Sequence, residues 1–391
     1  MMIPRLRFPE FSDSWRLVPF EALAHLKTEH FTPGETVPSL PCVELEHLES
    51  GTGTILGTVP TAPGMSVKNR FSPGDVLFGK LRPNLRKYAR PDFGGVCSQE
   101  IWVLSGTQAE SGFLFQLVQT ERFLAAAQKT TGSRMPRAHW HTVGSALFPV
   151  PSLPEQRCIA DFLGIADEEI AERRQLIGAL KGQMQAVFRQ LFSQAEALEE
   201  GTLASLPGWR LLPLSAVLTE RREFAENDGT YPHVSLTKEG VIPKTARYNR
   251  DFLVKSPKKA YRITRLGDIC YNPANLKFGV ICRNRLGDGI FSPIYAAFSV
   301  NPGFHPAFVE LSVTRPSFLL RALRYQEGTV YERMSVRPEY LLALKIAVPE
   351  PARQREFAQT AALLEEQIAQ EEGILRDLIL RKQGLLQRML P

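Results

Sequence analysis

The sequence repeats itself, and the repeat limits what the chain can fold into. The segment Trp15–Phe20 (WRLVPF) recurs as Trp209–Leu214 (WRLLPL), an offset of 194. Residues 151–192 align without gaps onto residues 349–390 at an offset of 198, with 9 of 42 positions identical. Offsets this regular indicate duplicated structural units. We therefore expect long and short units in alternation, with boundaries at 1–150, 151–200, 201–348 and 349–391.

The short units have the apolar pattern of long helices. Their apolar residues recur at alternating spacings of four and three, which is typical of a coiled-coil seam. The seam breaks at Arg173 in the first copy and at Glu371 and Lys382 in the second. Two matched helices cover each other most simply when antiparallel, in a rod of about 50 Å. Opposite charges at Arg173 and Glu371 suit facing helices. The alternative is that each helix packs on its own domain alone.

The long units have the pattern of mixed α and β structure. Short β-rich runs lie between Gly, Pro and Asn turns. Helical stretches follow at 112–128 and 306–325, and short strands at 147–151 and 345–349 lead into the long helices. The predicted class is α+β, with two mixed α/β domains separated by an antiparallel two-helix coiled coil in a pseudo-two-fold repeat. The β-rich runs are residues 75–78, 101–104 and 297–300.

Basic charge gathers in two stretches of the long units. The chain has 391 residues and a net charge of +6. Residues 68–90 hold seven basic groups opposed only by Asp75, and residues 244–265 hold eight opposed only by Asp251. Such clusters favour a polyanionic partner, because each neutralised phosphate releases counterions. A solvated basic face without a partner is the alternative.

Cysteine usage and hydropathy indicate the cellular setting. The five cysteines are scattered without a C-x-x-C pair, which argues against a zinc site or a disulfide framework. No run of 18 apolar residues or signal-peptide core occurs. We expect a cytoplasmic protein without a membrane contact.

Catalytic motifs are missing from the sequence. It holds neither the G-x-x-x-x-G-K-[ST] phosphate loop nor the G-x-S-x-G nucleophile turn. Asn272–Asn275 (NPAN) shares its first two residues with the N-P-P-aromatic motif of adenine methyltransferases but lacks the second proline and the aromatic residue. His139 and His141 have no third metal ligand near in sequence. These absences favour binding over catalysis.

One motif and the unit order resemble a known family. Pro151–Ala160 (PSLPEQRCIA) is similar to the P-x-L-x-E-Q-x-x-I-A motif of the specificity subunit of type I restriction–modification enzymes, and the unit order matches over essentially the whole chain. The distal copy keeps Gln354 and Ile368 but has Arg353 in place of Glu155.

The resemblance implies a non-catalytic subunit that reads a bipartite, asymmetric sequence in double-stranded DNA. Each long unit acts as a target-recognition domain for one half-site. The coils set the separation and dock two modification subunits, which methylate adenine with S-adenosylmethionine. Restriction subunits add cleavage driven by ATP and Mg²⁺. The resemblance also implies that the chain itself needs no cofactor.

The expected contact residues fall into two sets. Polar and basic side chains of the turns after the predicted strands are candidates for DNA contacts: Lys80, Arg82, Asn84, Arg86, Lys87, Ser133, Arg134, Arg137, Asn272, Asn275, Lys277, Arg283, Thr329, Tyr331, Arg333 and Arg337. The coil and its motif supply residues for helix pairing and partner docking: Glu155, Gln156, Ile159, Leu163, Ile170, Ile177, Leu180, Gln354, Phe357, Ile368, Leu375 and Leu378.

Two other functions compete with this interpretation. A self-contained DNA-modifying enzyme would methylate or cut DNA without partners. A coiled-coil DNA-binding scaffold without sequence preference would bind all duplexes equally. The residues do not distinguish base readout from phosphate anchoring.

Overall fold

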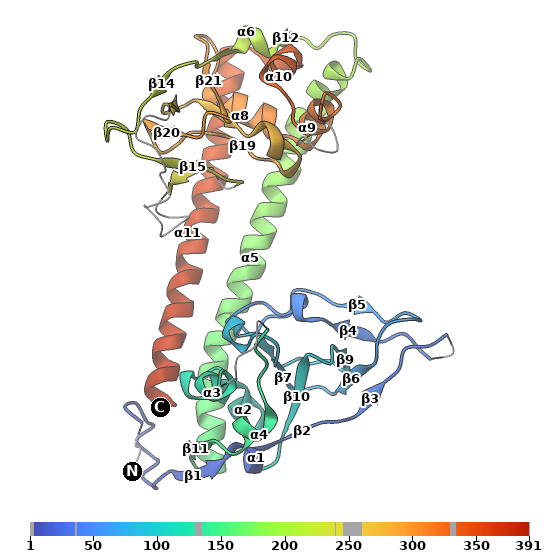
Figure 1. The fold of residues 1–391 in the computed structure, drawn as a ribbon, viewed down its shortest axis with the longest axis vertical. Helices are drawn as coiled ribbons and strands as arrows, with labels where there is room; N and C mark the ends of the chain where they lie inside the picture. The colour runs from blue at the N-terminus through green and yellow to red at the C-terminus, as the bar shows by residue number, and fades with distance from the viewer. Residues whose placement is uncertain are drawn as a thin grey trace. The chain divides into compact units, whose positions relative to one another are not determined.

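Two long helices and two mixed domains make up the part of the chain that the structure describes. The computed structural model describes residues 4–35, 37–129, 135–238, 240–244, 260–328 and 334–390. These residues form two compact units, one of residues 1–179 with 369–391 and the other of residues 180–368. The helices α5 (Leu153–Glu199) and α11 (Pro351–Met389) each contribute turns to both units (Figure 1).

The described residues of the first unit form three sheets. Sheet one pairs β1 (Arg16–Pro19) with β11 (Leu147–Val150). Sheet two has the order β2 (Ala24–Leu26), β10 (Ile101–Gly106), β7 (Val76–Gly79), β8 (Tyr88–Ala89). Sheet three has the order β3 (His30–Phe31), β6 (Lys68–Phe71), β9 (Gly95–Cys97), β4 (Pro41–Val43), β5 (Val59–Pro60). The strands predicted at 75–78, 101–104 and 147–151 are therefore confirmed.

The first unit also contains short helices, and its core joins one of them, α2 (Ser111–Leu117), to the two long helices. The short helices are α1 (Phe20–Leu23), η1 (Leu45–His47), η2 (Pro83–Leu85), α2, α3 (Glu121–Ala127) and α4 (Trp140–Gly144). Helix α2 begins where the Glu110 carboxylate accepts the N–H of Phe113 at 2.9 Å. The buried core joins Phe113 to Leu163 of α5 and to Leu386 of α11.

The second unit repeats this plan. Its sheets pair β12 (Trp209–Pro213) with β22 (Lys345–Pro349), and order β13 (Leu218–Glu220), β21 (Ala296–Val300), β18 (Ile269–Tyr271), β19 (Ile281–Arg283). Smaller sheets order β14 (Phe224–Ala225), β17 (Tyr261–Thr264), β20 (Gly289–Phe291), and pair β15 (Val234–Leu236) with β16 (Val241–Pro243). Its helices are α6 (Leu214–Val217), η4 (Pro273–Phe278), α8 (Pro306–Thr314), α9 (Pro316–Leu323) and α10 (Pro338–Ala343). The four-stranded sheets of the two units have matching strand orders, as the repeat predicts.

Aromatic packing ties the second unit to both long helices. The rings of Phe192 on α5 and Phe357 on α11 lie 5.0 Å apart, and Phe308 of α8 is 5.9 Å from the first and 5.6 Å from the second. All three rings are buried. Close aromatic pairs add to the stabilisation that apolar burial provides.

The helices pair in antiparallel fashion within the first unit. Arg173 on α5 forms an ion pair with Glu371 on α11, the two seam breaks that the sequence places opposite each other. Six residues before Arg173, Asp167 pairs with Lys382, which lies 11 residues after Glu371. The paired residues run in opposite directions along the two helices, so the antiparallel prediction is confirmed.

The second interruption of the α11 seam is a buried lysine. Lys382 is 7 % exposed, and its ammonium donates to Asp167 and, at 2.8 Å, to the Gln119 Oε1 atom. Asp167 also accepts from the Gln116 Nε2 atom at 2.8 Å. Burial lowers the pKa of Lys382, and the attraction of Asp167 opposes that shift. This network joins both helices to α2 and the α2–α3 connection.

Among the described residues, no helix is long and apolar enough to cross a membrane.

The Lys382 network predicts a stability change. Lys382→Met should lower the free energy of unfolding by about 2 kcal/mol, because the half-buried Asp167 loses its ion pair. Urea unfolding followed by circular dichroism measures the change, with Arg376→Met, an exposed position on the same helix, as the control. Equal stability of the Lys382→Met protein and the wild type would contradict a stabilising network.

Candidate nucleic-acid interface

A tight turn connects β7 and β8 in the first unit. It contains η2, and the residues on either side of it, Arg82 and Arg86, have left-handed φ angles of 52° and 51°. Non-glycine residues adopt this conformation at a cost, so surrounding contacts must hold it. The Arg82 N–H donates to the Pro136 carbonyl at 2.7 Å, and the Arg86 carbonyl accepts from the Gly51 N–H at 2.8 Å. Both ends of the turn are thus fixed by backbone hydrogen bonds.

The structure sorts the predicted residues of this turn into two kinds. Arg86 forms a two-pronged pair with Glu121 of α3, at 2.6 and 2.9 Å, and the Lys87 ammonium donates to the Leu45 carbonyl at 2.6 Å. Arg82 and Asn84 are exposed, and Lys80 is half-buried. Arg82 and Asn84 are therefore the side chains that the turn offers to solvent, while Arg86 and Lys87 bind within the domain.

A second predicted segment lies beside the turn. Leu81 and Arg137 form an isolated β-bridge, and the Ala138 N–H donates to the Lys80 carbonyl at 2.8 Å. The Arg137 guanidinium pairs with Glu100 at 3.0 and 3.1 Å. Ser133 and Arg134 lie outside the described residues.

The second unit has the equivalent turn between β18 and β19. Asn272 is buried, and its side chain accepts the Ala274 N–H at 3.1 Å, so it caps η4. Asn275 is half-buried, and Lys277 is exposed with its ammonium 5.0 Å from the centre of the Phe278 ring. The Val336 N–H donates to the Pro273 carbonyl at 3.1 Å. Each unit therefore places a second chain segment against its turn.

The other predicted residues of the second unit are mostly engaged or undescribed. Arg283 pairs with the half-buried Glu310 of α8 at 3.2 Å. Arg337 is exposed and lies 3.4 Å from Glu327. Thr329, Tyr331 and Arg333 lie outside the described residues.

The glutamine of the sequence motif at the start of each long helix forms hydrogen bonds within the chain. The Gln156 side chain accepts the Glu110 N–H at 2.9 Å and donates to the Pro151 carbonyl at 3.2 Å. Gln354 accepts the His305 N–H at 2.8 Å and donates to the Pro349 carbonyl at 2.9 Å. Both glutamines are buried. The repeat thus keeps glutamine where it fastens a short helix to a long one.

Glu155 and the apolar seam residues also lie within the chain. Glu155 is 1 % exposed and accepts from Arg7 at 2.7 and 2.8 Å and from the Trp15 indole at 3.2 Å. Most predicted seam residues are buried, and two are half-buried. The buried ones are Ile159, Leu163, Ile170, Ile177, Leu180, Phe357 and Ile368, and the half-buried ones are Leu375 and Leu378. A partner that docks on the helices would therefore meet mainly their exposed neighbours.

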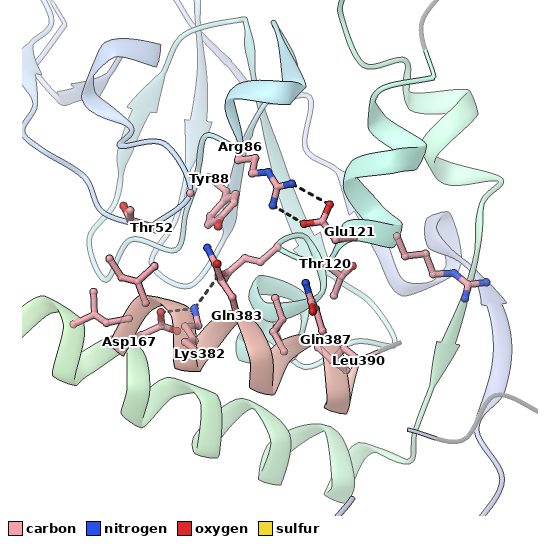
Figure 2. Close-up of a pocket in the computed structure, with 16 residues that line it drawn as sticks. Thr52, Arg86, Tyr88, Thr120, Glu121, Asp167, Lys382, Gln383, Gln387 and Leu390 are labelled. Atoms are coloured by element: carbon pink, nitrogen blue, oxygen red, sulfur yellow. Dashed lines mark hydrogen bonds and ion pairs between the residues drawn. The ribbon is translucent and has the colours of Figure 1, made fainter. Parts of the chain in front are cut away.

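The residues beneath the first turn enclose a cavity of about 330 Å³. Figure 2 shows Lys382 and Asp167 on one side of it, with Tyr88, Arg86 and Glu121 on the side of the turn. Burial raises the pKa of Tyr88, so its hydroxyl stays protonated. Four charged residues of this cavity form two ion pairs, Arg86 with Glu121 and Lys382 with Asp167. We therefore regard the polar turn as the better binding surface.

Two observations concern the metal-ligating and thiol groups of the described residues. No group of three His, Cys, Asp or Glu side chains there is placed to hold a metal ion. The Cys42 thiol is buried, and burial raises its pKa to about 11, so it is not a reactive thiolate.

Sequence reasoning missed several charged contacts that organise the domains. Arg285 bridges Glu310 at 2.8 Å and Glu365 of α11 at 2.6 Å, and Arg174 of α5 contacts Glu49 at 2.5 Å. Neither arginine belongs to a motif, and their partners lie far away in sequence. The one available signal is that Glu365 occupies the position of Asp167 in the repeat.

Comparison with known proteins identifies what the fold resembles. No family model matches the chain. A stretch of 151 residues, 38 % of the chain, is 26 % identical to the specificity subunit of the type I restriction enzyme EcoDI from Escherichia coli. The chain spans about a third of that curated relative, 34 % of its length.

Two solved structures share the fold over nearly the whole chain. One belongs to a study of complex assembly and conformational transition in a type I R-M system, with 19 % identity, a TM-score of 0.51, and coverage of 96 % and 97 % of the two chains. The other is the type I restriction-modification S subunit from M. genitalium, with 15 % identity, a TM-score of 0.58, and coverage of 100 % and 99 %. The predicted fold class and the resemblance to type I specificity subunits are confirmed.

Proposed function

We propose that the chain is the DNA-specificity subunit of a type I restriction–modification complex and carries out no chemistry itself. The observation that carries the proposal is the repeated pairing of a polar turn with a second chain segment, once in each unit, on domains fastened to two shared helices. Two similar but non-identical reading surfaces suit a bipartite, asymmetric target. The curated likeness to a specificity subunit supports the same function.

Exposed polar residues of the turns, together with the half-buried Asn275, are the proposed contacts with DNA. Arg82 and Asn84 in the first domain, with Lys277 and Asn275 in the second, have donors that match base edges in the major groove. Arg137 and Arg337 flank these turns and suit phosphate contacts. Of the residues predicted from sequence, Ser133, Arg134, Thr329, Tyr331 and Arg333 keep their proposed DNA role without a structural description.

The partners of this function are two modification subunits, with restriction subunits added for cleavage. S-adenosylmethionine, ATP and Mg²⁺ belong to those partners in this proposal, and the complex acts on DNA in the cytoplasm. Incubating the pure chain with DNA and all three small molecules tests the division of labour. Methylation or cutting by the chain alone would favour a self-contained enzyme.

The sorting of the turn residues predicts different effects on DNA binding. The double variant Lys80→Gln with Arg82→Gln should reduce the magnitude of the slope of log affinity against log salt concentration by about one to two. Each phosphate contact contributes close to one to that slope. The matched variant Arg86→Gln with Lys87→Gln should change that slope less, because these side chains bind Glu121 and Leu45. Titration of duplex DNA at several salt concentrations gives both slopes. Equal slopes in the wild type and both variants would place the turn outside the interface.

Modularity of the two domains provides the test of sequence recognition. Replacing residues 201–348 with the equivalent domain of a relative should change one half of the methylated sequence and leave the other unaltered. Sequencing methylated DNA from the complex with modification subunits reads both halves at once. A change in both halves would mean joint reading, and no preference in either would favour a scaffold without sequence specificity.

The length of the paired helices should set the gap between half-sites. Deleting Ile177–Gln183 together with Leu375–Arg381 removes one heptad, about 10 Å, from each helix. The methylated target should keep both half-sites while its gap shrinks by about three base pairs, because B-DNA rises 3.4 Å per base pair. Methylation of a library with varied gaps measures this, and full activity on the original spacing alone would show that the helices do not measure the target.

A further inference from the structure

A small loop in the first unit lies between the long helix α5 and the polar turn. Leu48 and Ile55 form a β-bridge that closes the loop, and the Glu49 N–H donates to the Thr54 carbonyl at 3.0 Å. A side chain at Gly53 would begin 2.6 Å from the Phe115 ring of α2. Only glycine fits there, so the loop rests directly on the core of the domain.

One side of this loop is bound to α5. The Arg174 guanidinium forms an ion pair with Glu49 at 2.5 Å and donates to the Thr54 hydroxyl. The Thr52 hydroxyl donates to the same Glu49 carboxylate at 2.7 Å. The Arg174 side chain is 19 % exposed, so water screens these contacts less than it screens a surface pair.

The other side of the loop is bound to the turn. The Gly51 N–H donates to the Arg86 carbonyl at 2.8 Å, and Ser50 forms a β-bridge with Lys87. Arg86 is one of the two residues held in the left-handed conformation. The loop therefore supplies part of the constraint that keeps the strained end of the turn in place.

We infer that Arg174 of the central helix is a positioning residue for base selection by the first domain. This inference rests on the proposed function. Arg174 is engaged by Glu49 and Thr54, so its effect passes through the loop to Arg86 and from there to the exposed Arg82 and Asn84. Its guanidinium has several donors in a fixed plane, which lets one side chain hold two acceptors of the loop at once.

Direct base contacts need accurate placement, and a looser turn accepts more bases. The strength of a hydrogen bond to a base edge falls steeply as its distance lengthens or its angle departs from linear. Loss of the Arg174 contacts should therefore relax the choice of base in one half-site, without removing the exposed cations that attract phosphates. In the variant, sequence preference should therefore fall while the overall affinity for DNA stays close to that of the wild type.

The test uses the full chain in complex with modification subunits. Arg174→Gln is compared with the matched control Arg157→Gln, an exposed arginine on the same helix. Each protein methylates a DNA library randomised at both half-sites, and the selected bases are counted by sequencing. In Arg174→Gln we expect discrimination to fall about 3- to 10-fold in the half-site of the first domain. The other half-site is the internal reference and should not change.

Two further variants and two further measurements separate positioning from general damage. Arg174→Lys keeps the charge beside Glu49 but loses the planar set of donors, so its discrimination should be intermediate. Exchanging the charges, Arg174→Glu with Glu49→Arg, should restore part of the discrimination. The melting temperature and the salt slope of DNA binding should stay close to those of the wild type in Arg174→Gln.

Two results would overturn the inference. One is unchanged base selection in Arg174→Gln, and the other is equal loss in both half-sites together with a lower melting temperature. A different result, a wild-type complex without sequence preference in either half-site, would contradict the proposed function itself. That outcome is therefore distinguishable from failure of the inference about Arg174.

Discussion

Neither domain closes its hydrophobic core with its own residues. The first unit needs Leu163 of α5 and Leu386 of α11, and the second needs Phe192 of α5 and Phe357 of α11. Because each helix contributes turns to both units, its sequence must satisfy two cores and one helix seam. The buried glutamines of the repeated motif make the same connection with hydrogen bonds. The domains that carry the polar turns are therefore completed by the same two helices.

Charge is distributed differently from what the basic clusters indicate. The cluster at residues 68–90 is a basic stretch in sequence, but in the structure Lys68 binds Glu44, Arg70 binds Glu29 and Arg86 binds Glu121. Acidic partners come from other parts of the domain and neutralise much of the stretch. The side chains that the first turn offers to a polyanion are fewer, and their placement matters more than the count of charges.

The sequence predicted the architecture well because the repeat and the seam are local or periodic patterns. The strands at 75–78 and 101–104 and the opposition of Arg173 and Glu371 followed from such patterns, and the structure has them. The individual roles within the turns did not follow, because they depend on partners distant in sequence. Arg82 and Arg86 are four residues apart and look alike in the sequence, yet only Arg86 meets Glu121. The seam pattern marks Lys382 as an interruption, but its neighbours Asp167 and Gln119 are visible only in the folded chain.

The sharing of α11 also imposes an order on synthesis. Leu386, Met389 and Leu390 belong to the same core as Phe113 and Leu163, although the whole second domain is translated between them. At about 5–20 residues per second, the first domain waits on the order of ten seconds or more for its last side chains. Until then the core of the first domain lacks these α11 side chains, while the second domain receives its own turns of α5 and α11 earlier. The domain encoded first is thus the one completed last.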